Sequence, residues 1–133
     1  MSPDQQPIDG LVTKDCPLSV ADTVARLSAL LAEKGVKLFA VIDHSGEAHA
    51  HGLGLRETKV VIFGSPVGGT PVMQARPLAA LDLPLKVLVW DDGGQTKITY
   101  APPAVLAARY GIPDELAAPL GAINVLTDAV IAG

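Results

Sequence analysis

The chain has 133 residues, of which 49% are apolar, 18% charged and only 4% aromatic. This length suits one domain whose core is built from aliphatic side chains and needs neither disulfides nor metals. The net charge of −4, with ten basic residues scattered along the chain, excludes a protein that binds nucleic acid through clustered lysines and arginines.

The N-terminal residues have neither the basic start nor the apolar run of a signal or transit peptide. We expect residues 1–10 to form a flexible N-terminus before a single domain over residues 11–133. No apolar run has the length of a bilayer span, and the only cysteine, Cys16, has no partner for an internal disulfide. These features predict a cytoplasmic protein without a membrane partner.

A short strand is predicted over residues 10–15, and the clearest helix of the chain follows it. Ser19 is a good N-cap for this helix, Asp22 lies in its first turn, and Gly35 ends it. Between the caps, four apolar residues recur at helical spacing and predict a face that covers a core. They are Val20, Val24, Leu27 and Leu31.

Three segments, 37–43, 59–63 and 85–90, are predicted strands with apolar side chains on both faces. This pattern is typical of central strands that are covered on both sides. A strand over residues 95–100 is expected to pair with the preceding strand as a hairpin through residues 91–94. Its side chains Thr96, Ile98 and Tyr100 share one face.

Pro102 and Pro103 predict the start of a helix that ends at Gly111. A last helix is expected to begin near Asp114, or to restart at Pro119, and to turn apolar residues inward. These are Leu120, Ile123, Leu126 and Val130. The order of elements predicts an α+β fold, a two-layer sandwich with a mostly antiparallel sheet and helices packed mainly on one face.

Helices on one face would leave apolar strand residues uncovered on the other face. These are Phe39, Val41, Val61 and Phe63, or their neighbours. A monomer seldom exposes so much contiguous apolar surface. The sequence therefore predicts a homodimer that buries this face, with the short middle helices as an alternative cover.

A glycine-rich loop is predicted over residues 64–71, with Thr70 as the N-cap and Pro71 as the first residue of a following helix. Free amides at a helix N-terminus can bind an anion, so one interpretation is a pocket for a small anion or polar molecule. In the other interpretation the glycines only permit the turn. The lysine and the spacing of a phosphate-binding P-loop are missing.

Asp43, His44, His49 and His51 form a second cluster, which holds all three histidines of the chain. Imidazole and carboxylate groups can bind zinc, so one alternative is a metal-binding protein that uses His44, His49 and His51. In another, His44 is a general acid or base that Asp43 orients. The structural alternative is an exposed polar segment. The spacing matches no established metal motif, so no metal ligand is predicted.

A third group lies around the predicted strand at 85–90. Lys86 and Trp90 share one strand face, and the lysine stem can lie beside the indole while its ammonium pairs with Asp82 or a ligand anion. The alternative is a structural ion pair beside a packed tryptophan.

At residues 63–92, FGSPVGGTPVMQARPLAALDLPLKVLVWDD resembles the domain of unknown function 302 family. VIDHSGEAHAHGLGL before it and TYAPPAVLAARYGI after it extend the likeness to about residues 11–132. Family members usually have asparagine at position 65, where this chain has Ser65, which keeps a hydroxyl but lacks the paired donor and acceptor of the amide. The matching residues are Asp43, His44, Phe63, Gly64, Pro66, Gly69, Thr70, Met73, Asp82, Leu83, Pro84, Lys86, Trp90 and Tyr100. The resemblance implies a compact α+β fold with a tendency to dimerise and implies no established reaction.

The leading hypothesis is a cytoplasmic, dimeric domain with a small polar-ligand or anion pocket between residues 64–70, His44 and residues 82–90. The candidate ligand-binding residues are Gly64, Ser65, Gly69, Thr70, Met73, Asp82, Lys86 and Trp90. The candidate catalytic residues are Asp43 and His44, and no cofactor is predicted.

Overall fold

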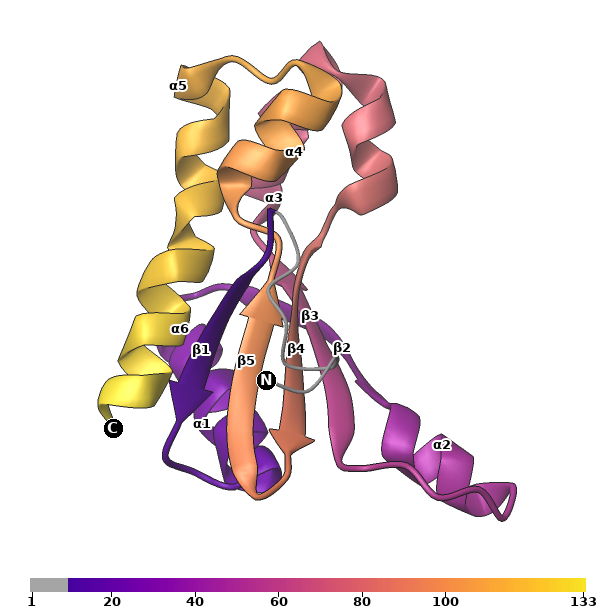
Figure 1. The fold of residues 1–133 in the computed structure, drawn as a ribbon. Coiled ribbons are helices and arrows are strands. Elements are labelled where there is room, and N and C mark those ends of the chain that lie inside the picture. The colour runs from indigo at the N-terminus through magenta and orange to yellow at the C-terminus, as the bar shows by residue number, and fades with distance from the viewer. Residues whose placement is uncertain (1–9) are drawn as a thin grey trace.

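The computed structural model describes residues 10–133, which are built around one five-stranded sheet (Figure 1). The strands are β1 (Val12–Cys16), β2 (Lys37–Asp43), β3 (Thr58–Gly64), β4 (Leu85–Asp92) and β5 (Gln95–Tyr100). Their order is β1-β5-β4-β3-β2, and every neighbouring pair is antiparallel. The predicted α+β fold is thereby confirmed. The predicted flexible N-terminus lies outside the described residues, apart from Gly10.

Two long helices supply the second layer. α1 (Val20–Glu33) lies behind the sheet in Figure 1, and α6 (Ala122–Ala132) packs against α1 and β1. As predicted, the hydroxyl of Ser19 accepts a hydrogen bond from the amide of Asp22 at 3.1 Å, and Gly35 follows the helix with a φ of 69°. The two helices and the sheet share one core, whose fully buried side chains include Leu27, Leu31, Val61, Phe63, Val87, Val89, Ile98, Ile123, Leu126 and Val130.

Shorter helices gather at one end of the sheet, at the top of Figure 1, and form what we call the helical cap. The cap consists of α3 (Pro66–Ala75), the 3₁₀ helix η2 (Pro77–Asp82), α4 (Pro103–Tyr110), α5 (Asp114–Ala117) and the 3₁₀ helix η3 (Ala118–Gly121). At the other end, α2 (His44–Ala50) projects from the sheet as a separate arm (Figure 1). The cap and this arm are thus held at opposite ends of one scaffold.

The C-terminal segment is divided into α5, η3 and α6, and all four residues predicted to point inward are buried. Its stretch Asp114–Ala132 is long and apolar enough to cross a membrane by length and composition alone. The sequence analysis predicted no apolar run as long as a bilayer span and therefore missed this segment. In the structure, four apolar side chains of the segment pack into the core, whereas Val125 is 61% exposed.

β2 is the strand for which the sequence-based prediction is wrong. It was expected to be a central strand, but it lies at the edge of the sheet, and all seven of its residues are exposed. Val61 and Phe63, predicted among the uncovered residues, are instead buried in the core, whereas Phe39 and Val41 are 47% and 41% exposed. Apolar alternation is the same in edge and central strands, so it could not place β2 within the sheet.

Candidate functional site

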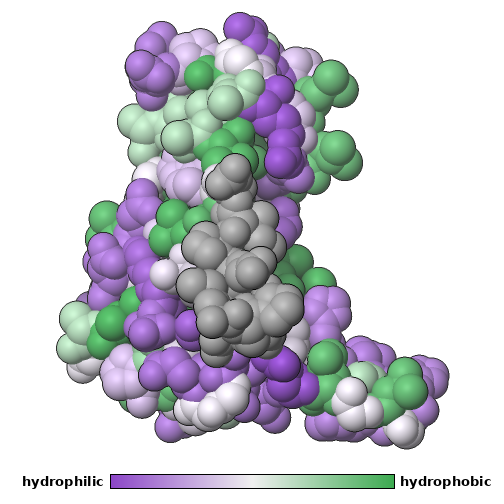
Figure 2. Space-filling view, viewed as in Figure 1, coloured by the Kyte–Doolittle hydropathy of each residue, from purple (hydrophilic) through white to green (hydrophobic). Residues whose placement is uncertain are grey.

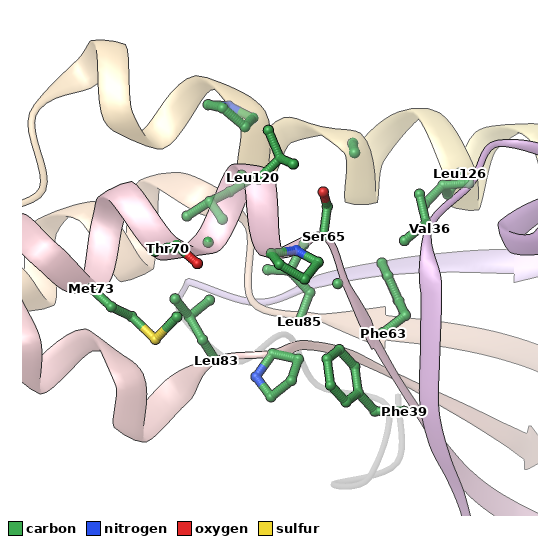
Figure 3. Close-up of a pocket in the computed structure, with 18 residues that line it drawn as sticks. Val36, Phe39, Phe63, Ser65, Thr70, Met73, Leu83, Leu85, Leu120 and Leu126 are labelled. Atoms are coloured by element: carbon green, nitrogen blue, oxygen red, sulfur yellow. The ribbon is translucent and has the colours of Figure 1, made fainter.

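A cavity of about 540 Å³ opens where β3, β4 and the helical cap meet (Figure 3). Its walls come from the ends of β2 and β3, from α3, from residues 83–85 and from the segment that leads into α6. Five of the predicted ligand-binding residues line it: Gly64, Ser65, Gly69, Thr70 and Met73. The sequence therefore located one wall of this cavity.

The cavity walls are mainly apolar. Phe63 and Leu85 form the sheet side, and Leu120 and Leu126 form the side of the C-terminal segment. Hydroxyl groups come from Ser65 and Thr70, which Figure 3 shows on the α3 side. Among the described residues that line the cavity, none has a charged side chain. The interior is therefore suited to apolar groups, with hydrogen bonding available at α3.

The segment predicted as a glycine-rich loop is part of a helix. α3 begins at Pro66, with Ser65 at the N-cap position, so the predicted N-cap at Thr70 is wrong. Proline suits the first helical position because its fixed φ is helical. The amides of Gly68 and Gly69 donate to the carbonyl of Ser65 at 3.0 and 2.8 Å. Since these amides are used inside the helix, they are not available to an anion.

Asp82, Lys86 and Trp90 lie outside the cavity lining. Lys86 donates from Nζ to the carbonyls of Asp82 and Pro84 at 3.3 and 3.2 Å, and the indole of Trp90 donates to the hydroxyl of Thr99 at 3.0 Å. Lys86 thus bonds backbone carbonyls, while the carboxylate of Asp82, its partner in the predicted structural ion pair, is paired with Arg109.

Asp82 joins η2 to α4. Its Oδ2 accepts hydrogen bonds from Nη1 of Arg109 at 2.6 Å and from the hydroxyl of Tyr110 at 2.5 Å. These donors hold the pKa of Asp82 below its usual value of 3.8, with Tyr110 as the larger cause. The sequence-based account did not find Arg109 and Tyr110, because nothing local relates residues that are 27 and 28 positions away.

The lowered pKa of Asp82 predicts a loss of stability in acid. A carboxyl with a depressed folded pKa stabilises the fold above its unfolded pKa, and this contribution disappears as the pH falls through the folded pKa. We expect Asp82→Asn to lower Tm by a few degrees at neutral pH. The gap between wild type and variant should shrink from about pH 5 to about pH 2. Thermal unfolding followed by circular dichroism measures both curves, and a gap that stays constant with pH would contradict this role.

The histidine cluster lies on the arm, away from the cavity. Asp43 is the N-cap of α2: its Oδ1 accepts hydrogen bonds from the amide of Gly46 and the hydroxyl of Ser45, both at 2.9 Å. These bonds lower the pKa of Asp43, the amide being the larger cause. His44 is exposed at the first position of α2. The predicted orientation of His44 by Asp43 is thus replaced by helix capping.

β2 also separates His44 from the cavity within one chain. Lys37 pairs with Gly64 at the cavity end, whereas Asp43 pairs with Lys59 at the other end. The pocket predicted between residues 64–70, His44 and residues 82–90 is therefore not assembled from a single copy. Across residues 10–133 there is also no group of three histidine, cysteine or acidic side chains able to hold a metal ion, so the metal-binding alternative finds no site there.

Comparisons with known proteins give one family and one fold. The family described as "Domain of unknown function DUF302" matches residues 12–130. Two curated relatives, each named "Fluoride-specific ion channel FluC 1", come from Brucella suis and Brucella abortus; both are 41% identical over 104 residues, or 77% of this chain. The matched region is 41% and 38% of those relatives, so the chain spans about two fifths of their length.

A solved structure supports the fold independently. The crystal structure of an uncharacterized conserved DUF302 protein from Bacillus stearothermophilus covers 94% of this chain and is itself covered to 98%. The TM-score is 0.78 at 20% sequence identity. At this identity the likeness shows that the two proteins share a fold.

Proposed function

The chain belongs to the DUF302 family, as its motifs over residues 63–92 predicted, and we propose that it is a small-molecule-binding domain. Its ligand would be a mainly apolar molecule with one polar group, bound in the cavity between the sheet and the helical cap. We further propose that it acts as a homodimer in the cytoplasm, where a buried, unpaired Cys16 suits a reducing environment.

The observation that carries the proposal is the lining of the cavity. A volume of about 540 Å³ lies in the range of sites for small molecules and cofactors, which are mostly apolar with a few placed polar groups. Val67, Met73 and Leu83 contribute apolar surface, and Ser65 and Thr70 contribute hydroxyl groups. We therefore propose an apolar molecule with a single hydrogen-bonding group in place of the predicted small polar ligand or anion.

The names of the Brucella relatives suggest a second candidate, a domain that binds fluoride. Identity of 41% over 77% of the chain is the observation in its favour. Fluoride is strongly hydrated, and an anion that loses its water needs charged or hydrogen-bonding partners. The two hydroxyl groups of the cavity are few for that purpose, so the apolar ligand is the better-supported candidate.

The proposal predicts binding of a neutral apolar probe. N-phenyl-1-naphthylamine should gain fluorescence on binding, and 1-decanol should displace it. Thr70→Val keeps the shape of the side chain but removes the hydroxyl, so it should weaken displacement by decanol by about fivefold, the value of one hydrogen bond. Lys86→Ala, outside the cavity, is the matched control and should leave binding unchanged.

Thermal unfolding in two sodium salts separates the two candidates. Sodium fluoride and sodium chloride at equal ionic strength should have the same effect on the thermal unfolding of the protein. Stabilisation by fluoride alone, together with failure to bind the apolar probe, would overturn the proposal in favour of fluoride binding.

A further inference from the structure

Two lysines stand beside the edge of the cavity that Phe39 and Pro84 form. A Cβ placed on Gly64 would lie 3.7 Å from Cε2 of Phe39 and 3.3 Å from Cβ of Pro84, so the two side chains are neighbours across that glycine. Nζ of Lys37 lies 4.9 Å from the centroid of the Phe39 ring. Nζ of Lys86 donates to the carbonyl of Pro84 at 3.2 Å. This edge of the cavity therefore has two ammonium groups next to it.

The sheet directs both lysines to the same face. Lys37 is paired with Gly64 of β3. Lys86 is paired with Ile62, two residues earlier in the same strand. Residues two apart in a strand share a face, and so do directly opposed residues, so both lysines project from one side of the sheet. The irregular pairing in β2 begins after Leu38 and does not affect this register. Strand spacing puts the two lysine Cα atoms about 12 Å apart, from where both long side chains can reach one ligand group.

Both ammonium groups have protons left for a ligand. Within residues 10–133, neither lysine forms an ion pair, and Lys37 makes no hydrogen bond. Lys86 uses two of its three protons on the carbonyls of Asp82 and Pro84. The carboxylate of Asp82 is already paired with Arg109. The charges of the two lysines are therefore available to an anion.

This edge is also accessible to water. Phe39 is 47% exposed, and both lysines are exposed. Figure 2 shows the right-hand outline hollowed between the helical cap above and the arm of α2 below, and β2 lies along this hollow in Figure 1. An anion bound here can keep part of its hydration, so it avoids the cost of burying a charge in the apolar interior.

The hydroxyl of Thr70 lies toward the other end of the cavity. Figure 3 shows Phe39 and Met73 at opposite ends of the lining, with Leu85 between them. Thr70 is three residues before Met73 on α3, so the two side chains are neighbours on that helix. The cavity thus has a neutral hydroxyl at one end and two cations outside the other.

We propose that the ligand is a long-chain carboxylate of the fatty-acid type. Its apolar chain fills the cavity, and its carboxylate binds Lys37 and Lys86 at the edge formed by Phe39 and Pro84. One donor from each lysine matches the two oxygens of a carboxylate, in charge-assisted hydrogen bonds. The inference rests on the ligand cavity of the proposed function and identifies the single polar group of the ligand as an anion.

Displacement of N-phenyl-1-naphthylamine by decanoate tests the inference, at about pH 8, where the carboxyl group is ionised, and below the micelle-forming concentration. Lys37→Gln and Lys86→Gln each remove a charge but keep a polar side chain. Each should weaken displacement by decanoate about fivefold and leave displacement by 1-decanol unchanged. Decyltrimethylammonium has the same chain length and the opposite charge, so it should displace the probe from wild type less well than decanoate.

Thr70→Val and Lys59→Gln are the controls. Thr70→Val should weaken displacement by decanol but not by decanoate, since the two head groups bind at opposite ends of the cavity. Lys59 is paired with Asp43 at the far end of the sheet. Lys59→Gln removes the same charge from the molecule as the lysine variants do, and it should leave displacement by decanoate unchanged.

Two results would overturn the inference while leaving the cavity in place. One is displacement by decanoate that neither Lys37→Gln nor Lys86→Gln changes. The other is an equal loss in Lys59→Gln, which would show that only the net charge matters. Failure of wild type to bind N-phenyl-1-naphthylamine at all would instead overturn the proposed function, and this inference with it.

Discussion

Replacing Phe63 with alanine should cost about 3–5 kcal/mol of unfolding free energy. Phe63 is the largest of the fully buried side chains, at 1% exposure, and it lies between the core and the cavity. Truncation removes its apolar contacts and leaves a void that the neighbouring strands cannot fill. Thermal unfolding should show a drop in Tm of about 10 °C or more.

Val67→Ala is the matched control for this experiment. Val67 lines the same cavity but is 86% exposed, so its truncation should change stability by about 0.5 kcal/mol or less. Equal losses for the two variants would show that Phe63 does not support the core as described. Because Phe63→Ala enlarges the cavity, the folded variant should still bind N-phenyl-1-naphthylamine.

Gly69→Leu should reduce the affinity for N-phenyl-1-naphthylamine at least tenfold while preserving the fold. A Cβ at Gly69 would meet only the terminal methyl of Met73, at an ordinary contact distance of 3.8 Å. The added side chain would therefore enter the cavity without backbone strain. Replacing glycine inside a helix should also stabilise α3 by up to about 1 kcal/mol. Probe titration and thermal unfolding measure the two effects, which have opposite signs.

Gly68 is the matched control for the substitution at Gly69. A Cβ at Gly68 would lie 3.2 Å from Cβ of Pro119, where α3 packs closely on η3. Gly68→Leu should therefore lower Tm, whereas Gly69→Leu should not. Undiminished probe binding by a folded Gly69→Leu variant would show that the probe binds elsewhere.

The elements predicted well from the sequence are those that local chemistry decides. Ser19 and Gly35 set the limits of α1 through a side-chain cap and a positive φ. The hairpin between β4 and β5 was predicted because glycines favour such a turn. In the structure Gly93 and Gly94 both adopt positive φ, at 62° and 100°. In each case the residues that determine the structure are neighbours in the chain.

The predictions were wrong where contacts between residues distant in the sequence determine the structure. Gly68, Gly69 and Pro71 favour a loop by their intrinsic propensities, yet α3 forms because Val72 is fully buried and η3 packs closely on the helix. Pro71 removes one hydrogen bond inside this helix, and tertiary packing outweighs that cost.

Only part of the candidate site could be predicted, because its two walls are distant in the sequence. Ser65 and Thr70 were identified because they belong to one continuous motif that forms a wall of the cavity. The opposite wall comes from Leu120, Ala122 and Leu126, at least 50 residues later in the chain. No periodicity relates the two segments, so only the folded arrangement brings them together.

The two edges of the sheet differ in how they are covered, and the difference limits growth of an assembly by strand addition. β1 packs against α6, and Nζ of Lys14 binds Oδ1 of Asp128 in that helix at 2.8 Å. A helix that covers an edge strand hinders the pairing of that strand with another chain. Addition of a further strand is therefore hindered at the β1 end of the sheet.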